Sequence, residues 1–148
     1  MAIDKLDKKI INIMIENSRL SYRQIAKKAK VSVVTIMNRV KKLESDRYIT
    51  KYTVALDYDR LDFDVQVIID IRVSKGKLFQ VENKIAVHPN VFAVYDNTGN
   101  FDATIIAKFP SRREMDRFLK AIQSYDFVER TETKMILNTF KEGGIKLR

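Results

Sequence analysis

The chain has 148 residues, of which 45% are hydrophobic, 9% aromatic and 32% charged, a composition that excludes a collagen-like repeat and a disordered tail. It contains no cysteine and one histidine, which excludes a disulfide framework and a cysteine nucleophile and predicts no metal site. Its apolar runs are far shorter than the roughly 20 residues of a membrane span, and Asp4 and Lys5 stand where a signal peptide would be apolar. We therefore expect a cytoplasmic protein with no membrane partner.

Positive charge is concentrated in the first third of the chain. Residues 1–50 hold twelve basic and five acidic side chains, whereas residues 51–148 hold sixteen and fourteen. The net charge of the whole chain is +9, of which +7 belongs to the first fifty residues. A basic module beside a nearly neutral one indicates that the first binds a polyanion, although an ordinary solvated surface would carry the same charge.

Three helices are predicted within the first fifty residues. An apolar stripe at helical spacing, preceded by Asp4 as N-cap, consists of Leu6, Ile10, Ile13 and Met14. Ser21 opens a capping-box pattern before a second helix, and Ser32 precedes a third stripe, formed by Val33, Ile36, Val40 and Leu43. Because only Lys30 and Val31 separate the last two helices, these must cross sharply, as in a helix-turn-helix.

The third helix carries a polar, basic face opposite its apolar stripe. An α-helix fits the major groove of DNA, where Arg can bond guanine, Asn can bond adenine, and Val or Thr can contact a thymine methyl group. An ordinary amphipathic helix with a wet basic face is the alternative. The predicted DNA-binding residues are those of this face and of the two helix starts: Ser21, Tyr22, Arg23, Ser32, Val34, Thr35, Asn38, Arg39, Lys41 and Lys42.

The following segment, residues 51–64, is predicted to form a hinge strand and a linker. Residues 49–56 have the composition of a strand, and residues 57–64 include four aspartates. These aspartates lack the central glycine and the closing glutamate of a calcium loop, so a solvated acidic connection is the better interpretation.

Residues 65–148 alternate strands and helices. Strands are predicted over 65–73, 91–96, 102–109 and 128–137, and helices over 78–85 and 111–122. The order βαββαβ predicts a ferredoxin-like domain, in which two helices cover one face of an antiparallel sheet. The other face carries Ile68, and Phe92 or Val94, among polar groups, which predicts dimerisation through it. The fold class is therefore α+β, with an N-terminal helix-turn-helix domain (1–50) before the ferredoxin-like domain.

Short motifs along essentially the whole chain resemble the Lrp/AsnC family of transcription regulators, also called feast/famine regulators. The motifs are Leu6–Ile10, Ile25–Ala29, Arg39–Glu44, Tyr48–Tyr52 and Thr98–Asp102. The resemblance implies that residues 1–50 bind double-stranded DNA and that residues 65–148 bind a small effector, such as an amino acid, and mediate oligomerisation. It implies a homodimer that can assemble further into a tetramer or octamer.

The resemblance also implies an effector site at the glycine-containing turn and on the last strand. Free backbone N–H groups at such a turn suit the carboxylate of an amino acid, and Asp102 can hold its ammonium. From the residues alone, Gly99 and Asn100 could equally complete a tight hairpin that Asp102 caps. The effector-binding residues implied by the family are Asp96, Asn97, Thr98, Gly99, Asn100, Asp102, Thr133, Lys134, Met135 and Ile136, in a site that crosses a subunit boundary.

Two positions depart from the family pattern. Lys30 stands where glycine is usual, so either it adopts a left-handed conformation at a cost of about 1–2 kcal/mol, or the geometry of the turn differs slightly. Asn100 stands where an aspartate is frequent, so one carboxylate near the ligand amine is missing.

An enzyme is not predicted. His88 precedes Pro89 in a loop that ends a helix, no phosphate-cradling motif is present, and no catalytic constellation or cofactor is indicated. The predicted function is a sequence-specific DNA-binding transcriptional regulator that responds to a small effector. The alternative is an architectural protein that binds DNA without a ligand, chiefly through phosphate contacts.

Overall fold

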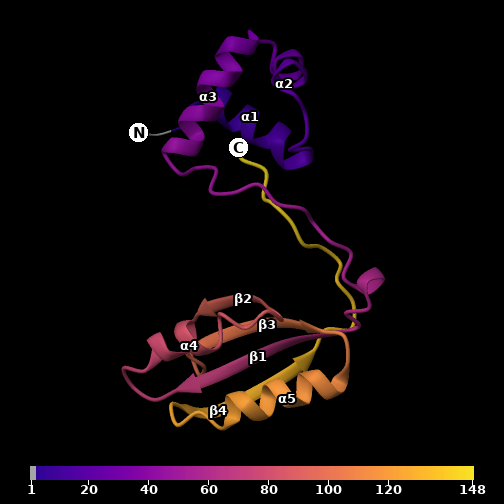
Figure 1. The fold of residues 1–148 in the computed structure, drawn as a ribbon. Helices are drawn as coiled ribbons and strands as arrows, with labels where there is room; N and C mark the ends of the chain where they lie inside the picture. The colour runs from indigo at the N-terminus through magenta and orange to yellow at the C-terminus, as the bar shows by residue number, and fades with distance from the viewer. Residues whose placement is uncertain (1–2) are drawn as a thin grey trace. The chain divides into compact units, whose positions relative to one another are not determined.

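A computed structural model describes residues 3–148 and divides the chain into two compact units (Figure 1). One unit contains the chain up to Ala55 together with Lys141–Arg148, and the other contains Leu56–Phe140. The predicted α+β fold class is confirmed, with three helices in the first unit and the order βαββαβ in the second.

The first unit is a three-helix bundle of α1 (Lys5–Glu16), α2 (Tyr22–Ala29) and α3 (Val33–Ser45). Each predicted N-cap is confirmed, since Asp4, Ser21 and Ser32 each accept a backbone N–H from the first turn of their helix. The helices enclose a core whose buried members include Ile10, Met14, Ile25, Ile36, Val40 and Leu43. Val33, which the sequence pattern placed on this apolar stripe, is instead exposed at the start of α3.

The C-terminal tail, Lys141–Arg148, packs with the first unit, although the predicted boundaries assign it to the second domain. The side chain of Asn12 on α1 donates to the carbonyl of Leu147 and accepts its N–H, both at 2.8 Å. Lys146 pairs with Glu16 at 2.6 Å. The tail is therefore held by main-chain recognition and an ion pair that no local sequence pattern reveals.

The predicted hinge strand is not formed. Residues 51–57 have no regular structure in the described chain, because no neighbouring strand accepts and donates their backbone hydrogen bonds. The segment is still anchored, since the Tyr52 hydroxyl donates to Glu44 of α3 at 2.6 Å. A short 3-10 helix, η1 (Asp59–Leu61), follows in the acidic stretch.

The second unit contains a four-stranded antiparallel sheet in the order β2-β3-β1-β4 (Figure 1). Its elements, in chain order, are β1 (Val65–Val73), α4 (Leu78–Lys84), β2 (Val91–Asp96), β3 (Ala103–Phe109), α5 (Arg112–Gln123) and β4 (Val128–Met135). Alternate residues of β1 and β3 pack against α4 and α5 in one core, whose fully buried members include Ile69, Ile71, Ile105, Phe109, Val81 and Ile122. Both helices therefore cover one face of the sheet, as predicted.

The other face of the sheet, called the open face below, mixes apolar and polar side chains. Ile68 and Ile106 pair across β1 and β3 on this face, and both are partly buried. Phe92 is 50% exposed, and the ammonium of Lys108 lies over its ring, 4.7 Å from the ring centroid. Val94 packs against the core on the helix side of the sheet. Of the two residues that the sequence offered as alternatives, Phe92 is therefore the one on the open face.

Candidate functional site

The turn between α2 and α3 is held by backbone geometry and helix caps. Lys30 is left-handed, with φ 63° and ψ 46°, which confirms the first of the two alternatives for this position. Lys9 of α1 donates to the carbonyl of Ala29 at 3.0 Å, where the end of α2 favours a cation. The Ser32 hydroxyl accepts the N–H of Thr35 at 3.1 Å. These bonds fix the direction in which α3 leaves the turn.

One face of α3 projects four side chains at helical spacing, and we call it the α3 face: Val34, Met37, Asn38 and Lys41. Val34 is 60% exposed and Met37 is 46% exposed, while the opposite stripe is buried in the core. Met37 is not among the residues predicted to contact DNA, although its position three residues after Val34 places it on the same face. The α3 face thus combines apolar, amide and cationic groups, the kinds of side chain that contact base edges and phosphates.

Arg39 lies off the α3 face and is paired with the start of α1. Its Nη1 is 2.6 Å from Asp4 Oδ2 and 3.1 Å from Asp7 Oδ1. The N–H of Asp7 and then Arg39 hold the pKa of Asp4 below its usual value, and Asp4 and Asp7 together raise the pKa of Arg39. The structure uses this guanidinium to join α3 to α1, which is not the role that the sequence predicted for it.

The remaining residues predicted to contact DNA fall into two groups. The Ser21 hydroxyl accepts the N–H of Gln24 at 3.2 Å and caps α2. The hydroxyls of Ser32, which caps α3, and Thr35 bond each other at 2.8 Å, so all three side chains bond groups at the start of their own helix. The exposed group consists of Tyr22, Arg23 and Lys42, in addition to Asn38 and Lys41 of the α3 face.

The second candidate site surrounds the turn of residues 97–102 between β2 and β3. Gly99 has φ +111°, and a side chain there would meet nothing within 4 Å, so its backbone is open. The N–H of Asn97 donates to the carbonyl of Asp102 at 2.9 Å and closes the turn. The Asp102 carboxylate accepts the N–H of Val73 at 2.7 Å and ties the turn to the end of β1. This bond is the capping role that the residues alone left open.

A cavity of about 500 Å³ lies beside this turn. Asp96 and Ala103, the residues that flank the turn, line it together with side chains of α4 that include Phe79 and Glu82. Two carboxylates on otherwise apolar walls suit a ligand with a cationic group and an apolar side chain.

The predicted effector residues of β4 lie away from this cavity within one chain. β4 and β2 are opposite edges of the sheet, with β1 and β3 between them. Thr133 pairs with Ile69 of β1, and Met135 pairs with Val67. The turn lies nearer the other end of β1, where Ala103, the residue that follows the turn, pairs with Ile71. The β4 residues therefore do not line the turn cavity of their own chain.

Hydrogen bonds nevertheless connect the turn to β4 across the open face. Asn97 and Asp70 both bond the Thr104 hydroxyl, and Lys134 donates to Asp70 at 2.7 Å. Burial raises the pKa of Asp70, but the bonds from Lys134 and Thr104 outweigh it and hold this pKa below its usual value. Asp70, followed by Glu132, raises the pKa of Lys134. Asp70 and Thr104 were not predicted as site residues, although a carboxylate on an otherwise apolar strand indicates a polar partner nearby.

Comparisons with known proteins match both units. Residues 3–50 match the model of a winged helix-turn-helix DNA-binding domain, and residues 66–145 match the Lrp/AsnC ligand binding domain. The chain belongs to the Lrp/AsnC family. It is 48% identical to an HTH-type transcriptional regulator of Pyrococcus furiosus over 96% of each chain. It is 32% identical to the HTH-type transcriptional regulator FL11 of Pyrococcus horikoshii, over 96% of this chain and 94% of that protein.

Solved structures agree with this assignment. The structure of AsnC from E. coli has a TM-score of 0.90 at 28% identity, covering 99% of this Lrp/AsnC chain and 100% of AsnC. A Neisseria meningitidis regulator solved in complex with L-Met has the same fold, with a TM-score of 0.90 at 22% identity over 99% of this chain and 97% of that one.

The family assignment makes this protein a DNA-binding transcriptional regulator with an effector-binding domain, and at the level of the family it supports a regulator rather than an enzyme. Within residues 3–148, no helix is long and apolar enough to cross a membrane. In the same part of the chain, no three His, Asp or Glu side chains converge to hold a metal ion.

Proposed function

We propose that this Lrp/AsnC regulator reads a specific DNA sequence with the α3 face, and that Tyr22, Arg23 and Lys42 contact the flanking phosphates. The observation that carries the proposal is the exposed stripe of Val34, Met37, Asn38 and Lys41, held over a buried stripe by the turn at Lys30. Apolar and amide groups in the middle of the stripe can discriminate bases, and the lysine at its end adds affinity that does not depend on sequence.

Arg39 takes a different part in this proposal. Because its guanidinium is bound by Asp4 and Asp7, we assign it to fixing the angle of α3 rather than to direct contact with a base. Arg39→Ala should therefore weaken binding to every DNA sequence alike and loosen α3, whereas Asn38→Ala should reduce discrimination at particular base pairs.

Titrations on DNA selected from random fragments, and on scrambled DNA, test this assignment. Asn38→Ala should cost about 1–3 kcal/mol of binding free energy on the selected sequence and little on scrambled DNA. Asn83→Ala on α4 removes the same exposed side chain from the second unit and is the matched control. Wild-type affinity and discrimination in both Asn38→Ala and a Met37→Ala variant would remove the α3 face as the reading surface.

We further propose that the regulator forms a homodimer through the open face, on which it can build tetramers or octamers. Phe92 and Tyr95 are 50% and 54% exposed there, beside partly buried Ile68 and Ile106, and a partner sheet would cover them. Ile106→Lys in the full chain should shift sedimentation equilibrium toward monomer, and Val87→Lys, at a 72% exposed loop position, should not. A dimer unchanged in Ile106→Lys would contradict the assignment.

The effector is proposed to be an amino acid bound in the cavity beside residues 97–102. Its ammonium would meet Asp96 and its carboxylate the open backbone around Gly99. Residues 133–136, at the end of β4 and just after it, would complete the site only from another subunit, since their own chain holds them apart from the turn. The structural bond of Asp102 makes it a supporting residue, and Asp96 is the exposed carboxylate of the cavity that flanks the turn.

Calorimetric titration with amino acids, beginning with L-methionine, tests this site with and without the selected DNA. A regulatory ligand must change DNA affinity and have its own affinity changed by DNA through the same factor, typically 5- to 150-fold. Asp96→Asn should abolish binding, while Asn100→Asp, which adds a carboxylate at the turn, should strengthen it. If no amino acid binds under either condition, a ligand-independent architectural role becomes the better account.

A further inference from the structure

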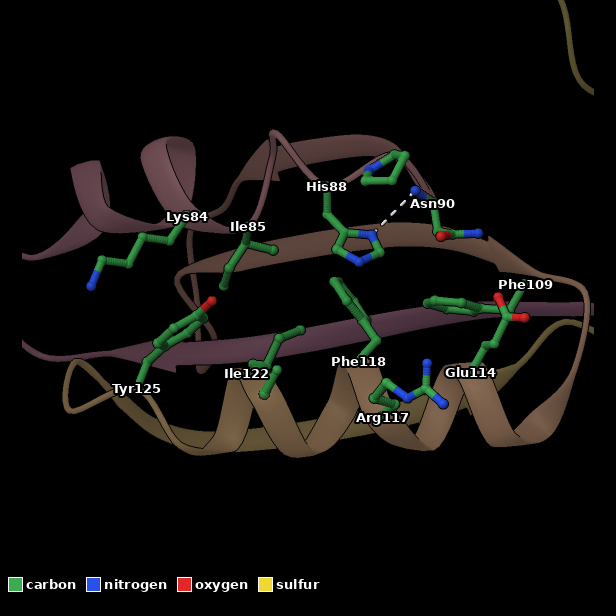
Figure 2. A pocket seen from close by; sticks show the side chains of 12 residues that line it. Lys84, Ile85, His88, Asn90, Phe109, Glu114, Arg117, Phe118, Ile122 and Tyr125 are labelled. Atoms are coloured by element: carbon green, nitrogen blue, oxygen red, sulfur yellow. Dashed lines mark hydrogen bonds between the residues drawn. The ribbon is translucent and has the colours of Figure 1, made fainter.

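A second cavity, of about 350 Å³, opens on the helix side of the sheet, and we call it the α5 pocket (Figure 2). It lies between α5 and the loop that joins α4 to β2, on the covered face of the sheet and not on the open face. Its volume is in the range of small-molecule sites, about 300–1,000 Å³, whereas packed cores rarely leave voids larger than a water molecule. None of its lining residues belongs to the turn of residues 97–102.

The floor of the α5 pocket is the upper surface of the hydrophobic core. Ile85, Phe109 and Ile122 are each 1% exposed, and Phe118 is 6% exposed. The rings of His88 and Phe118 are 4.6 Å apart, and those of Phe109 and Phe118 are 5.3 Å apart, so these rings pack on one another. The more accessible aromatic walls of the pocket are His88 and Tyr125. A flat apolar group is the shape that such walls accept.

The loop that forms the opposite wall is fixed before any ligand binds. Asn90 accepts the N–H of Lys108 at 2.9 Å and donates its side-chain amide to the Lys108 carbonyl at 2.8 Å. The N–H of His88 donates to the Ile85 carbonyl at 3.1 Å. Binding here would therefore lose little loop entropy.

His88 points from this loop toward Phe118 of α5 (Figure 2). Its Nδ1 accepts the N–H of Asn90 at 3.2 Å, which assigns the proton of the neutral ring to Nε2. Nε2–H is then a donor on the pocket side of the ring. Arg117 and Lys84 add two cations at the mouth against one carboxylate, Glu114.

We propose that the α5 pocket is a second small-molecule site of this regulator, separate from the amino-acid site, and that it takes an aromatic carboxylate. The ring would enter between the loop of His88 and α5, above the apolar floor, and the carboxylate would take the Nε2–H of His88 and the guanidinium of Arg117. The excess of cations at the mouth selects an anion, and the ring-lined walls select a planar body over an aliphatic one.

The test uses the full chain and three probes: phenylacetate, phenylacetamide as its uncharged analogue, and butyrate as an aliphatic carboxylate. Saturation-transfer NMR and calorimetry should show that phenylacetate binds and that the other two bind at least tenfold more weakly. Arg117→Gln should weaken phenylacetate binding about 10- to 100-fold, the range for losing one charge-assisted bond. Arg113→Gln removes the same charge from the same helix outside the pocket and should leave the affinity unchanged.

A second variant tests occupancy rather than charge. Ala121 is exposed on the rim of the pocket, so Ala121→Leu should reduce phenylacetate binding while thermal unfolding and DNA affinity stay at wild-type values. Equal losses in Arg113→Gln and Arg117→Gln would show general anion attraction and overturn the proposal. If phenylacetate binding is lost in Asp96→Asn but retained in Arg117→Gln, the probe binds at the turn of residues 97–102. That result would overturn the α5 pocket proposal without affecting the amino-acid site. Absence of phenylacetate binding at millimolar concentration would overturn it as well.

Discussion

Replacing Lys30 by glycine should stabilise the first unit, even though it removes a cation from the module that binds DNA. The left-handed conformation of Lys30 costs a residue with a Cβ atom about 1–2 kcal/mol, and glycine avoids this cost. Glycine also makes the unfolded chain more flexible, which lowers the free energy of unfolding by about 0.4–1 kcal/mol and offsets part of this gain. The difference is a gain of up to about 1.6 kcal/mol in the free energy of unfolding, with a central value of about 0.8 kcal/mol. In a domain of 60–100 residues, 1 kcal/mol shifts the midpoint temperature by roughly 4–8 °C.

Lys28→Gly is the matched control for this prediction. It removes the same exposed side chain and charge two positions earlier, inside α2, where the backbone is helical. Glycine in a helix interior costs about 0.5–1 kcal/mol, so the two variants should change stability in opposite directions. Urea unfolding of the full chain, with hydrogen exchange of peptides from residues 22–45 to assign the transition, measures both. A loss of stability in Lys30→Gly would refute the inference that this residue is strained.

Three further outcomes follow from the site geometry. Asp102→Ala should lower the free energy of unfolding by about 1.5–3 kcal/mol, because the N–H of Val73 loses a charged acceptor, and Asp102→Asn should lose less; equal losses in urea titrations would contradict this. The lowered pKa of Asp70 means that its carboxylate stabilises the fold above its unfolded-state pKa, near 3.9, and that this contribution is lost as the pH falls through the folded-state value. Asp70→Asn should therefore lower stability at pH 7 and flatten its dependence on pH below about 4, and acid unfolding curves identical to wild type would argue against it. Asn12→Ala should free the tail of Lys141–Arg148, seen as faster digestion by carboxypeptidase, and an unchanged digestion rate would show that its two bonds do not hold the tail.

The features that the sequence predicted correctly depend on neighbours a few residues apart. Ser21, Ser32 and Ser111 cap their helices through backbone groups three residues ahead, so a single short pattern contains the whole interaction. The left-handed conformation of Lys30 was expected instead from the resemblance to the family, which usually has glycine at this position of the turn. Alternation at period two was sufficient for β1, whose inward residues are all buried.

The features that the sequence did not reveal depend on residues far apart in the chain. Arg39 looks like a base-reading residue until Asp4 and Asp7, more than thirty positions earlier, are placed beside it. The strand predicted over 49–56 has the right composition, but a strand also needs a partner, which no local pattern supplies. The effector site is the intermediate case. Motif resemblance located the turn, and only the sheet order shows that residues 133–136 lie at the opposite edge.

The return of the tail to α1 means that the second unit is inserted into the first along the chain, rather than appended to it. Two segments connect the units, one leaving after Ala55 and one returning before Lys141. A truncation that appears to trim the effector domain from its C-terminus would therefore remove a piece of the DNA-binding unit first. A purification tag at that end would likewise sit on the DNA-binding unit, beside the helix whose first turn anchors Arg39. Fragments that divide the protein for separate study should carry residues 141–148 with the first unit, supplied as a linked or added peptide.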